Sequence, residues 1–434
     1  MKKLASYIIL LAAMSAASAE HSVTYSLDAS LTQSVDTDAD AGVQTLFELL
    51  PSIDVSLSPT TSIVTSARMR LDNSDDIEPG TPGYGNYWFG SRPQRLGRVG
   101  SLELRDAFVQ FAVPRGVVRL GKQQIVWGKM DGIKILDVIN PQDFRYFITE
   151  EFSDSRITLW SAYADISFGR WRTEFAVVPD SSGHVIPDSG AWFELRAPRF
   201  RFGATDATPA LPVYTREPGR GINDTGLGAR LSRSLGAMTL SAVAFSGRDP
   251  EPLGALIVNN QGPGVLRTLD RRETYGLSAD VSLGPVVARM EYARHPNRWF
   301  NIRQNGGLDR TRRNQSRAAI GFDVAGPFDT FINAQYFEDR VSGPEENLVR
   351  PTRDRLATVA VRKAIGFDRW EIQARYYRSL SDRDSMMTAS VNHSLSERTS
   401  LSIEALTFRG DDNGFFGQFR DRNMITLRLS HSLR

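Results

Sequence analysis

Apolar and polar residues alternate with a period of two along most of the chain, and this pattern constrains its fold more than any other feature. In residues 275–283, for example, Tyr, Leu, Ala, Val and Leu alternate with Gly, Ser, Asp and Ser. Successive side chains of a β-strand point to opposite faces, so each such segment predicts a strand with one apolar and one polar face. After residue 20, no apolar run reaches the roughly 20 residues that a membrane-spanning helix needs. The pattern therefore predicts an all-β protein.

We count eighteen segments of this kind. Strands are expected near residues 21–35, 43–57, 61–72, 100–113, 116–129, 157–168, 170–179, 225–235, 237–248, 272–283, 285–295, 314–324, 329–340, 353–365, 368–380, 384–395, 398–410 and 420–433. The alternation slips in phase near Arg105-Asp106 and near Lys122-Gln123, and a β-bulge at each place would explain the slip.

The connections between these segments alternate in length. Short ones, such as Gly284-Pro285 and Ser396-Glu397, alternate with connections that are mostly long: 73–99, 130–156, 180–224, 249–271, 296–313 and 341–352. Bacterial outer-membrane barrels combine an even strand number with short periplasmic turns and long extracellular loops, whereas a β-sandwich has no reason to sort its loops by length. We therefore predict a single antiparallel transmembrane β-barrel of about eighteen strands in the bacterial outer membrane.

The N-terminal residues predict export. Lys2 and Lys3 precede an apolar stretch at 8–13 and Ala-Ser-Ala at 17–19, the arrangement of a secretory signal peptide over residues 1–19. Cleavage after Ala19 leaves 20–434 as the barrel and lowers the formal net charge from +2 to 0, because two lysines and no acidic residue are removed. The chain contains no cysteine, which excludes disulfide scaffolds, thiolate zinc sites and iron–sulfur clusters.

Charged residues fall on the polar phase of the predicted strands, which would face the lumen. An arginine facing lipid at the bilayer midplane would cost about 2–4 kcal/mol, so this placement supports the predicted register. Both signs occur in comparable numbers, which predicts a mixed-charge lumen and argues against strong selectivity for one class of ion. Alternatively, these charges mainly pair with each other and hold the wall together. The predicted pore-lining residues are Arg68, Arg70, Arg172, Glu174, Arg230, Arg289, Glu291, Glu371 and Arg375.

The most distinctive local sequence lies at residues 121–147. It contains Gly-Lys-Gln at 121–123, Trp-Gly at 127–128 and Asn-Pro-Gln-Asp at 140–143. This combination resembles a widespread proteobacterial family of porin-like outer-membrane barrels without assigned function. Some of its relatives are similar to alginate-export or hydrophobic-compound uptake barrels. The resemblance covers about 30 residues closely and the remainder only as architecture, and it implies the passage of a solute.

The connection 130–156 is unusually apolar for an outer loop, with Ile133, Ile135, Leu136, Val138 and Ile139. Because these side chains would be unfavourable in water, we predict that the loop folds into the lumen and constricts it. Alternatively, it packs on neighbouring outer loops. The predicted constriction residues are Asp131, Lys134, Asp137, Asn140, Asp143 and Arg145.

Nothing in the sequence points to catalysis. The five histidines have no matched serine and acid at an obvious spacing, and no metalloprotease or nucleotide-binding motif occurs. We expect no enzyme activity, no cofactor and no metal site. The near-balance of 52 basic and 50 acidic residues argues against a nucleic-acid partner. The expected partners are outer-membrane lipids, a small-molecule solute and, during biogenesis, the barrel assembly machinery.

These features favour a channel for the passive passage of a small or amphipathic solute. Two other functions remain open. One is a structural or assembly barrel of an envelope lipid or export complex. The other is an outer-membrane enzyme whose site is assembled from separate strands.

Overall fold

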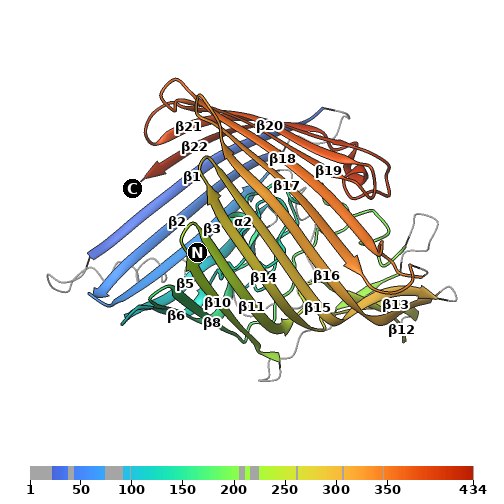
Figure 1. Ribbon diagram of the computed structural model, residues 1–434. Coiled ribbons are helices and arrows are strands. Elements are labelled where there is room, and N and C mark those ends of the chain that lie inside the picture. The colour runs from blue at the N-terminus through green and yellow to red at the C-terminus, as the bar shows by residue number, and fades with distance from the viewer. Residues whose placement is uncertain are drawn as a thin grey trace.

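A computed structural model describes residues 22–37, 44–73, 91–97, 99–204, 211–215, 224–260, 262–304, 307–345 and 347–433. The predicted signal peptide, residues 1–19, lies outside these ranges. Eighteen antiparallel strands form a closed barrel, and β1 closes it by pairing with β22 from Leu27↔Leu433 to Asp36↔Met424 (Figure 1). The predicted all-β barrel of eighteen strands is confirmed.

The wall strands follow one another around the barrel in chain order. They are β1 (Ser22–Asp36), β2 (Gln44–Ser58), β3 (Thr61–Asp72), β5 (Gly100–Val113), β6 (Gly116–Gln123), β7 (Leu159–Phe168), β8 (Trp171–Val178), β10 (Gly226–Leu235), β11 (Met238–Arg248), β14 (Arg271–Leu283), β15 (Val286–Gln304), β16 (Gly307–Ala325), β17 (Thr330–Val341), β18 (Arg353–Ile365), β19 (Trp370–Ser379), β20 (Ser385–Ser394), β21 (Thr399–Arg409) and β22 (Met424–Leu433).

Smaller elements belong to the connections. Strand β4 (Gln94–Leu96) pairs with β5 at one end of the barrel. Strands β9 (Val213–Thr215), β12 (Leu253–Asn259) and β13 (Gly262–Thr268) form a separate sheet. Within the described ranges, helical elements include α2 (Phe152–Ser155) and the 3-10 turn η3 (Gly417–Phe419). Among the described residues, no helix has the length and apolar character needed to cross a membrane.

The alternation of the strands separates the two faces of the wall. Along β14, Tyr275 and Leu277 are exposed on the outer face, whereas Thr274 and Ser278 are buried on the inner face. Glycines at positive φ, such as Gly169 and Gly236, occupy the tight turns between strands, because glycine adopts this conformation without steric cost. We call the end with these tight turns the short-turn end and the opposite end the long-loop end.

Three strand boundaries differ from the prediction. Strand β6 ends at Gln123 rather than near 129. The predicted loop 296–313 is instead the extended tip of the β15–β16 hairpin, with an irregularity between His295 and Arg298. A bulge does occur at Arg105, since Ser66 pairs with Asp106 and Ala67 with Leu104. No register shift occurs at Lys122-Gln123, where β6 pairs regularly with β7 up to its end.

Residues 124–158, which we call the inner segment, pack against inward-facing side chains of the wall. Ile135, Leu136, Val138 and Ile139 are at most 6% exposed. They belong to one buried cluster with side chains on the inner face of the wall, namely Val243, Phe245, Ala293, Ala319, Phe337 and Leu356. Burial of each aliphatic side chain contributes about 1.5–3 kcal/mol. A substantial part of the apolar core therefore lies inside the barrel.

Two glycines of the wall make room for this segment. A Cβ atom at Gly276 of β14 would lie 2.2 Å from Cδ2 of Leu136. At Gly228 of β10 it would lie 2.6 Å from Cη2 of Trp127. Such approaches are too close for any other residue, so the wall and the inner segment fit each other at these points.

We predict that Gly276→Val dislodges the inner segment without opening the wall. Overpacking against Leu136 should destabilise the protein by about 1–3 kcal/mol, while the backbone hydrogen bonds of β14 remain. Limited trypsin digestion should then cut faster after Lys129 and Lys134, as mapped by mass spectrometry. Ser278→Ala is the matched control, because Ser278 lies two residues further along the same face and its hydroxyl has no hydrogen-bond partner among the described residues. Equal protection in both variants would contradict this packing.

Candidate functional site: the interior of the barrel

The inner segment is joined at its two ends by Asn140. This side chain is 3% exposed; its Oδ1 accepts a hydrogen bond from the Ile125 N–H at 2.8 Å, and its Nδ2 donates to the Ile157 carbonyl at 2.7 Å. Next to it, Asp143 and Arg145 form a buried ion pair at 2.5 Å. Burial alone would raise the pKa of Asp143, but Arg145 lowers it below its usual value. The Asn-Pro-Gln-Asp sequence therefore closes and stiffens the segment.

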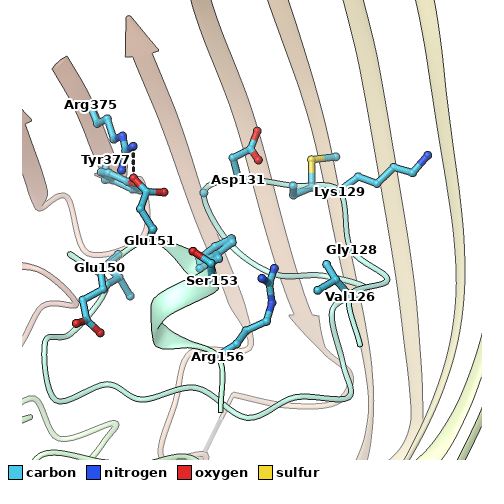
Figure 2. Close-up of a pocket in the computed structure, with 14 residues that line it drawn as sticks. Val126, Gly128, Lys129, Asp131, Glu150, Glu151, Ser153, Arg156, Arg375 and Tyr377 are labelled. Atoms are coloured by element: carbon cyan, nitrogen blue, oxygen red, sulfur yellow. Dashed lines mark hydrogen bonds and ion pairs between the residues drawn. The ribbon is translucent and has the colours of Figure 1, made fainter. Parts of the chain in front are cut away.

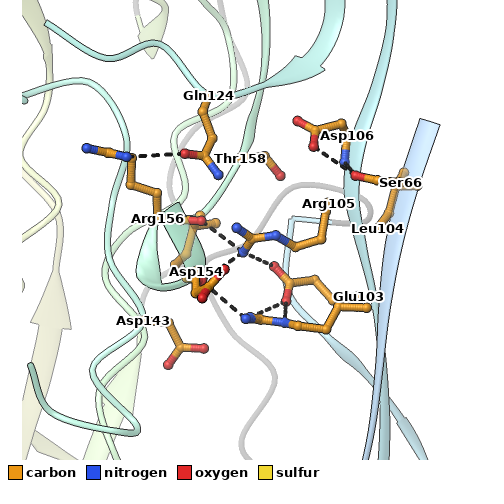
Figure 3. A network of polar contacts seen from close by, with 12 residues as sticks. Ser66, Glu103, Leu104, Arg105, Asp106, Gln124, Asp143, Asp154, Arg156 and Thr158 are labelled. Carbon is orange, nitrogen blue, oxygen red and sulfur yellow. Dashed lines mark hydrogen bonds and ion pairs between the residues drawn. The ribbon is translucent and has the colours of Figure 1, made fainter. Parts of the chain in front are cut away.

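A buried charge network fixes the segment to β3 and β5. Glu103 accepts hydrogen bonds from Arg68 at 2.6 Å and from Arg105 at 3.2 Å. Arg105 also donates to the carbonyls of Asp154 and Arg156, both at 3.0 Å, at the end of α2 (Figure 3). A cation is favourable at the carboxyl end of a helix, where carbonyl groups lack partners within the helix.

Contacts with the opposite side of the wall come from β14–β19. Glu291 of β15 accepts hydrogen bonds from the backbone N–H groups of Lys129 at 2.5 Å and Leu136 at 3.0 Å. Arg289 contacts Asp131 at 3.1 Å. Two ion pairs complete this side: Arg375 pairs with Glu151 at 2.5 Å, and Lys129 pairs with Asp280. The inner segment thus spans from β3 and β5 to β14–β19.

All nine predicted pore-lining residues lie on the inward phase of their strands, and they form two groups. Five contact the inner segment: Arg68, Arg70, Arg289, Glu291 and Arg375. The other four form pairs within the wall: Arg172 with Asp165 at 2.6 Å, Arg230 with Glu174 at 3.4 Å, and Glu371 with Arg362 at 3.9 Å. The inward-facing charges therefore pair partly within the wall and partly with the inner segment. Contact with a solute stays a prediction.

The predicted constriction residues also have defined contacts. Asp137 pairs with Arg156 at 2.6 Å and with Lys134 at 3.3 Å. Burial lowers the pKa of Lys134 to about 8, despite the opposing effect of Asp137. Its ammonium group therefore remains mostly protonated at neutral pH and loses its proton as the pH rises through about 8. A constricting role for these residues stays a prediction.

Two cavities adjoin the inner segment on its two sides. The first, of about 310 Å³, is lined on β19 by Arg375 and Tyr377; we call it the short-turn cavity (Figure 2). The second, of about 350 Å³, is lined on β19 by Ser379, the last residue of that strand at the long-loop end, and we call it the long-loop cavity. Only Gly132, Ile148 and Phe152 line both. These three residues therefore separate the two cavities.

Phe152 has cations near its ring. The Nζ atom of Lys134 lies 5.0 Å from the ring centroid, and Cζ of Arg156 lies 5.8 Å from it. Such contacts contribute about 0.5–2 kcal/mol and hold an aromatic ring in place. The sequence analysis did not identify Phe152, because it lies outside both the strand alternation and the aliphatic run at 133–139. It also missed the roles of Glu103 and Arg105, although the phase slip at Arg105-Asp106 was a signal for them.

The four histidines within the described ranges occupy structural positions. The Nδ1 atom of His184 accepts a hydrogen bond from the Gln142 N–H at 2.8 Å, and burial lowers its pKa to about 4. In β15, His295 forms a 3.0 Å hydrogen bond with Thr274. His393 stacks on Trp370, with ring centroids 3.9 Å apart, and His431 contacts Thr399. Within the described ranges, no group of three His, Asp or Glu side chains is placed to hold a metal ion.

The barrel architecture has counterparts among known proteins. The model of the family described as "Protein of unknown function (DUF1302)" matches residues 69–412. Similar solved structures include OccAB1 of Acinetobacter baumannii, with 8% sequence identity and a TM-score of 0.53 over 95% of this chain and 96% of that one. Another is OccK2 (OpdF) of Pseudomonas aeruginosa in complex with glucuronate, with 10% identity and a TM-score of 0.51 over 95% and 98% of the two chains.

OccK5 (OpdH) of Pseudomonas aeruginosa is similar to the same extent, with 9% identity and a TM-score of 0.50 over 95% and 98% of the chains. No curated protein matches the chain in sequence. At these identities the structures share only the fold, which is that of a porin-like barrel. The resemblance to a porin-like family without assigned function, seen at residues 121–147, is confirmed.

We predict that Glu103→Gln strongly destabilises the protein. Removing this buried carboxylate leaves Arg68 and Arg105 without their charge partner, which should cost about 3–5 kcal/mol. Glu371→Gln is the control, because its 3.9 Å pair with Arg362 is well exposed and should contribute at most about 1 kcal/mol. Urea unfolding of detergent-solubilised protein, followed by tryptophan fluorescence, measures both. Similar midpoints for the two variants would show that the Glu103 network does not hold the interior together.

Proposed function

The chain belongs to the DUF1302 family, whose function is unknown, and folds as a porin-like barrel; from this premise we propose that it is a passive channel of the bacterial outer membrane for small or amphipathic solutes. Its long loops would then face the outside and its tight turns the periplasm. In this proposal the protein is surrounded by outer-membrane lipids, inserted by the barrel assembly machinery, and neither binds a cofactor nor catalyses a reaction.

The observation that carries the proposal is the pair of cavities on the two sides of the inner segment. One cavity lies on each side of the inner segment, and only Gly132, Ile148 and Phe152 border both. A solute that crosses would leave the long-loop cavity, displace or pass the Phe152 ring, and enter the short-turn cavity. Phe152 belongs to the short helix α2 of the inner segment, so its ring can move without a change in the strands of the wall.

The charges along this route support a mixed-charge lumen. The short-turn cavity is lined by Glu150, Glu151 and Asp131 together with Lys129, Arg156 and Arg375. Three cations and three carboxylates leave no strong net field, so ions of either sign are not excluded. The long-loop cavity adds an apolar surface that a purely ionic pore would not need.

We expect the purified protein to conduct ions in planar lipid bilayers, and a variant that lacks residues 131–150 to conduct more. The deletion removes the segment that lies across the interior, while all eighteen wall strands remain. Single-channel recordings in potassium chloride measure both proteins, and heat-modifiable migration on gels verifies that each barrel is folded. Absence of conductance in both folded proteins would refute the channel and favour a structural or assembly barrel.

Phe152→Ala should raise single-channel conductance, since it removes the one large ring that borders both cavities. Phe144→Ala is the matched control: Phe144 lines only the long-loop cavity, where its ring packs edge-on against His184. The same bilayer recordings compare the two variants with the unmodified protein. An equal increase for both would place the narrowest point elsewhere.

A further inference from the structure

Arg317 has a guanidinium group that the protein does not use fully. It lies on the inward phase of β16 and lines the long-loop cavity. The carboxylate nearest to it belongs to Asp339, with Oδ2 at 3.6 Å from Nε of Arg317. This Nε is buried without an acceptor, and no hydrogen bond from the guanidinium is found among the described residues. A buried donor without a partner is unfavourable, because it has lost its hydrogen bonds to water.

The neighbouring carboxylates are already occupied. Asp339 accepts two hydrogen bonds from Gln315, both at 2.8 Å, and pairs with Arg350 at 3.0 Å. Two other acids that line the cavity are likewise engaged, Glu251 by Arg298 at 2.5 Å and Asp354 by Arg199 at 2.8 Å. Each of these acids already binds another side chain. The guanidinium of Arg317 can therefore donate hydrogen bonds to an acceptor from outside the protein.

The inner segment supplies an apolar surface to the same cavity. Ile133, Val138, Phe144, Ile148 and Phe152 all line it. The cavity of about 350 Å³ falls within the range of about 300–1,000 Å³ of small-molecule sites, which combine an apolar lining with a few polar anchors. A ligand that used only Arg317 would leave this surface exposed to water.

We propose that the long-loop cavity binds an amphipathic monoanion, with its carboxylate on Arg317 and its apolar body against the inner segment. The proposal rests on the channel function, and it names the class of solute that would pass. An arginine is suited to this role, because its planar guanidinium can donate two parallel hydrogen bonds to one carboxylate.

The surroundings also exclude other classes of ligand. The other arginines Arg199, Arg298 and Arg350 of the cavity are already paired with acids, so they offer no free partner to the further charges of a multiply charged anion. A sugar would place some of its hydroxyl groups on the apolar side of the cavity, where Ile133 and Val138 offer no hydrogen bond, which is unfavourable. A cation would be repelled by the guanidinium of Arg317, whose Nε has no hydrogen-bond acceptor among the described residues. A single negative charge on an apolar body satisfies both sides of the cavity.

Isothermal titration calorimetry of the full chain in lipid nanodiscs, with empty nanodiscs as the blank, tests the proposal. The probes are 2-naphthoate, its neutral counterpart 2-naphthamide, and acetate, which has the charge without the apolar body. We expect saturable binding of 2-naphthoate and at least tenfold weaker binding of the other two. Decanoate in place of 2-naphthoate distinguishes an alkyl from an aromatic body, and saturable binding of either acid supports the proposal.

Arg317→Gln should weaken binding of the acid at least tenfold. Arg313→Gln is the matched control: Arg313 lies four residues away on the same phase of β16, but it donates to the Ser342 and Pro344 carbonyls and lines neither cavity. Ile133→Ser probes the apolar surface independently and should also weaken binding. Heat-modifiable migration verifies that each variant is folded.

The outcomes separate this proposal from the channel function. Conductance without saturable binding of either acid, or binding that survives both Arg317→Gln and Ile133→Ser, overturns the binding site and leaves the channel intact. Binding that depends on Arg317, in a protein that conducts no ions, refutes the channel and supports the site.

Discussion

In hydrocarbon, every backbone N–H and C=O group must find its partner within the protein, and the pairing of β1 with β22 meets this requirement for the whole wall. Without it, both strands would present unpaired edges to lipid. Closure in turn imposes the two faces of the wall, since one face of every strand meets lipid and the other meets the interior. An interior surrounded by eighteen strands is too wide to be filled by wall side chains, so other parts of the chain occupy it.

The inner segment occupies this space through two kinds of contact. Toward β11–β18 apolar packing, with Leu136 seated against Gly276, is combined with the polar contacts of Arg289 and Glu291. Toward β3 and β5 it is ionic, with Arg105 joining Glu103 to the carbonyls at the end of α2. Buried ion pairs add little net stability when they replace apolar contacts, but they are costly to break. Together the two contacts hold the segment at one place across the lumen, and the two cavities follow from that position.

The sequence predicted the wall well because lipid imposes a strict period of two. The prediction was poorer beyond the membrane, where lipid no longer imposes this period. Strand β15 extends to Gln304 and β16 begins at Gly307. The alternation is interrupted in this hairpin tip by the adjacent aromatic residues Trp299 and Phe300. Beyond the membrane, neither face of a hairpin has to be uniformly apolar, so the period carries no information there. The bulge at Arg105 did leave a trace in the sequence as a phase slip, but the slip could not reveal that the side chain reaches α2.

The sequence by itself determined the barrel, its strand number and the face on which each wall residue lies, because these depend on the local alternation that membrane and lumen impose. It also indicated, through the aliphatic run at 133–139, a connection poorly suited to water. Only the tertiary structure decided what each inward side chain meets. Arg313 and Arg317 share one phase of β16, yet Arg313 donates hydrogen bonds to loop carbonyls, whereas Arg317 lines a cavity and has a 3.6 Å ion pair with Asp339. The period of two determines the face of the wall to which a side chain points. The group that it contacts depends on segments that are distant in the chain.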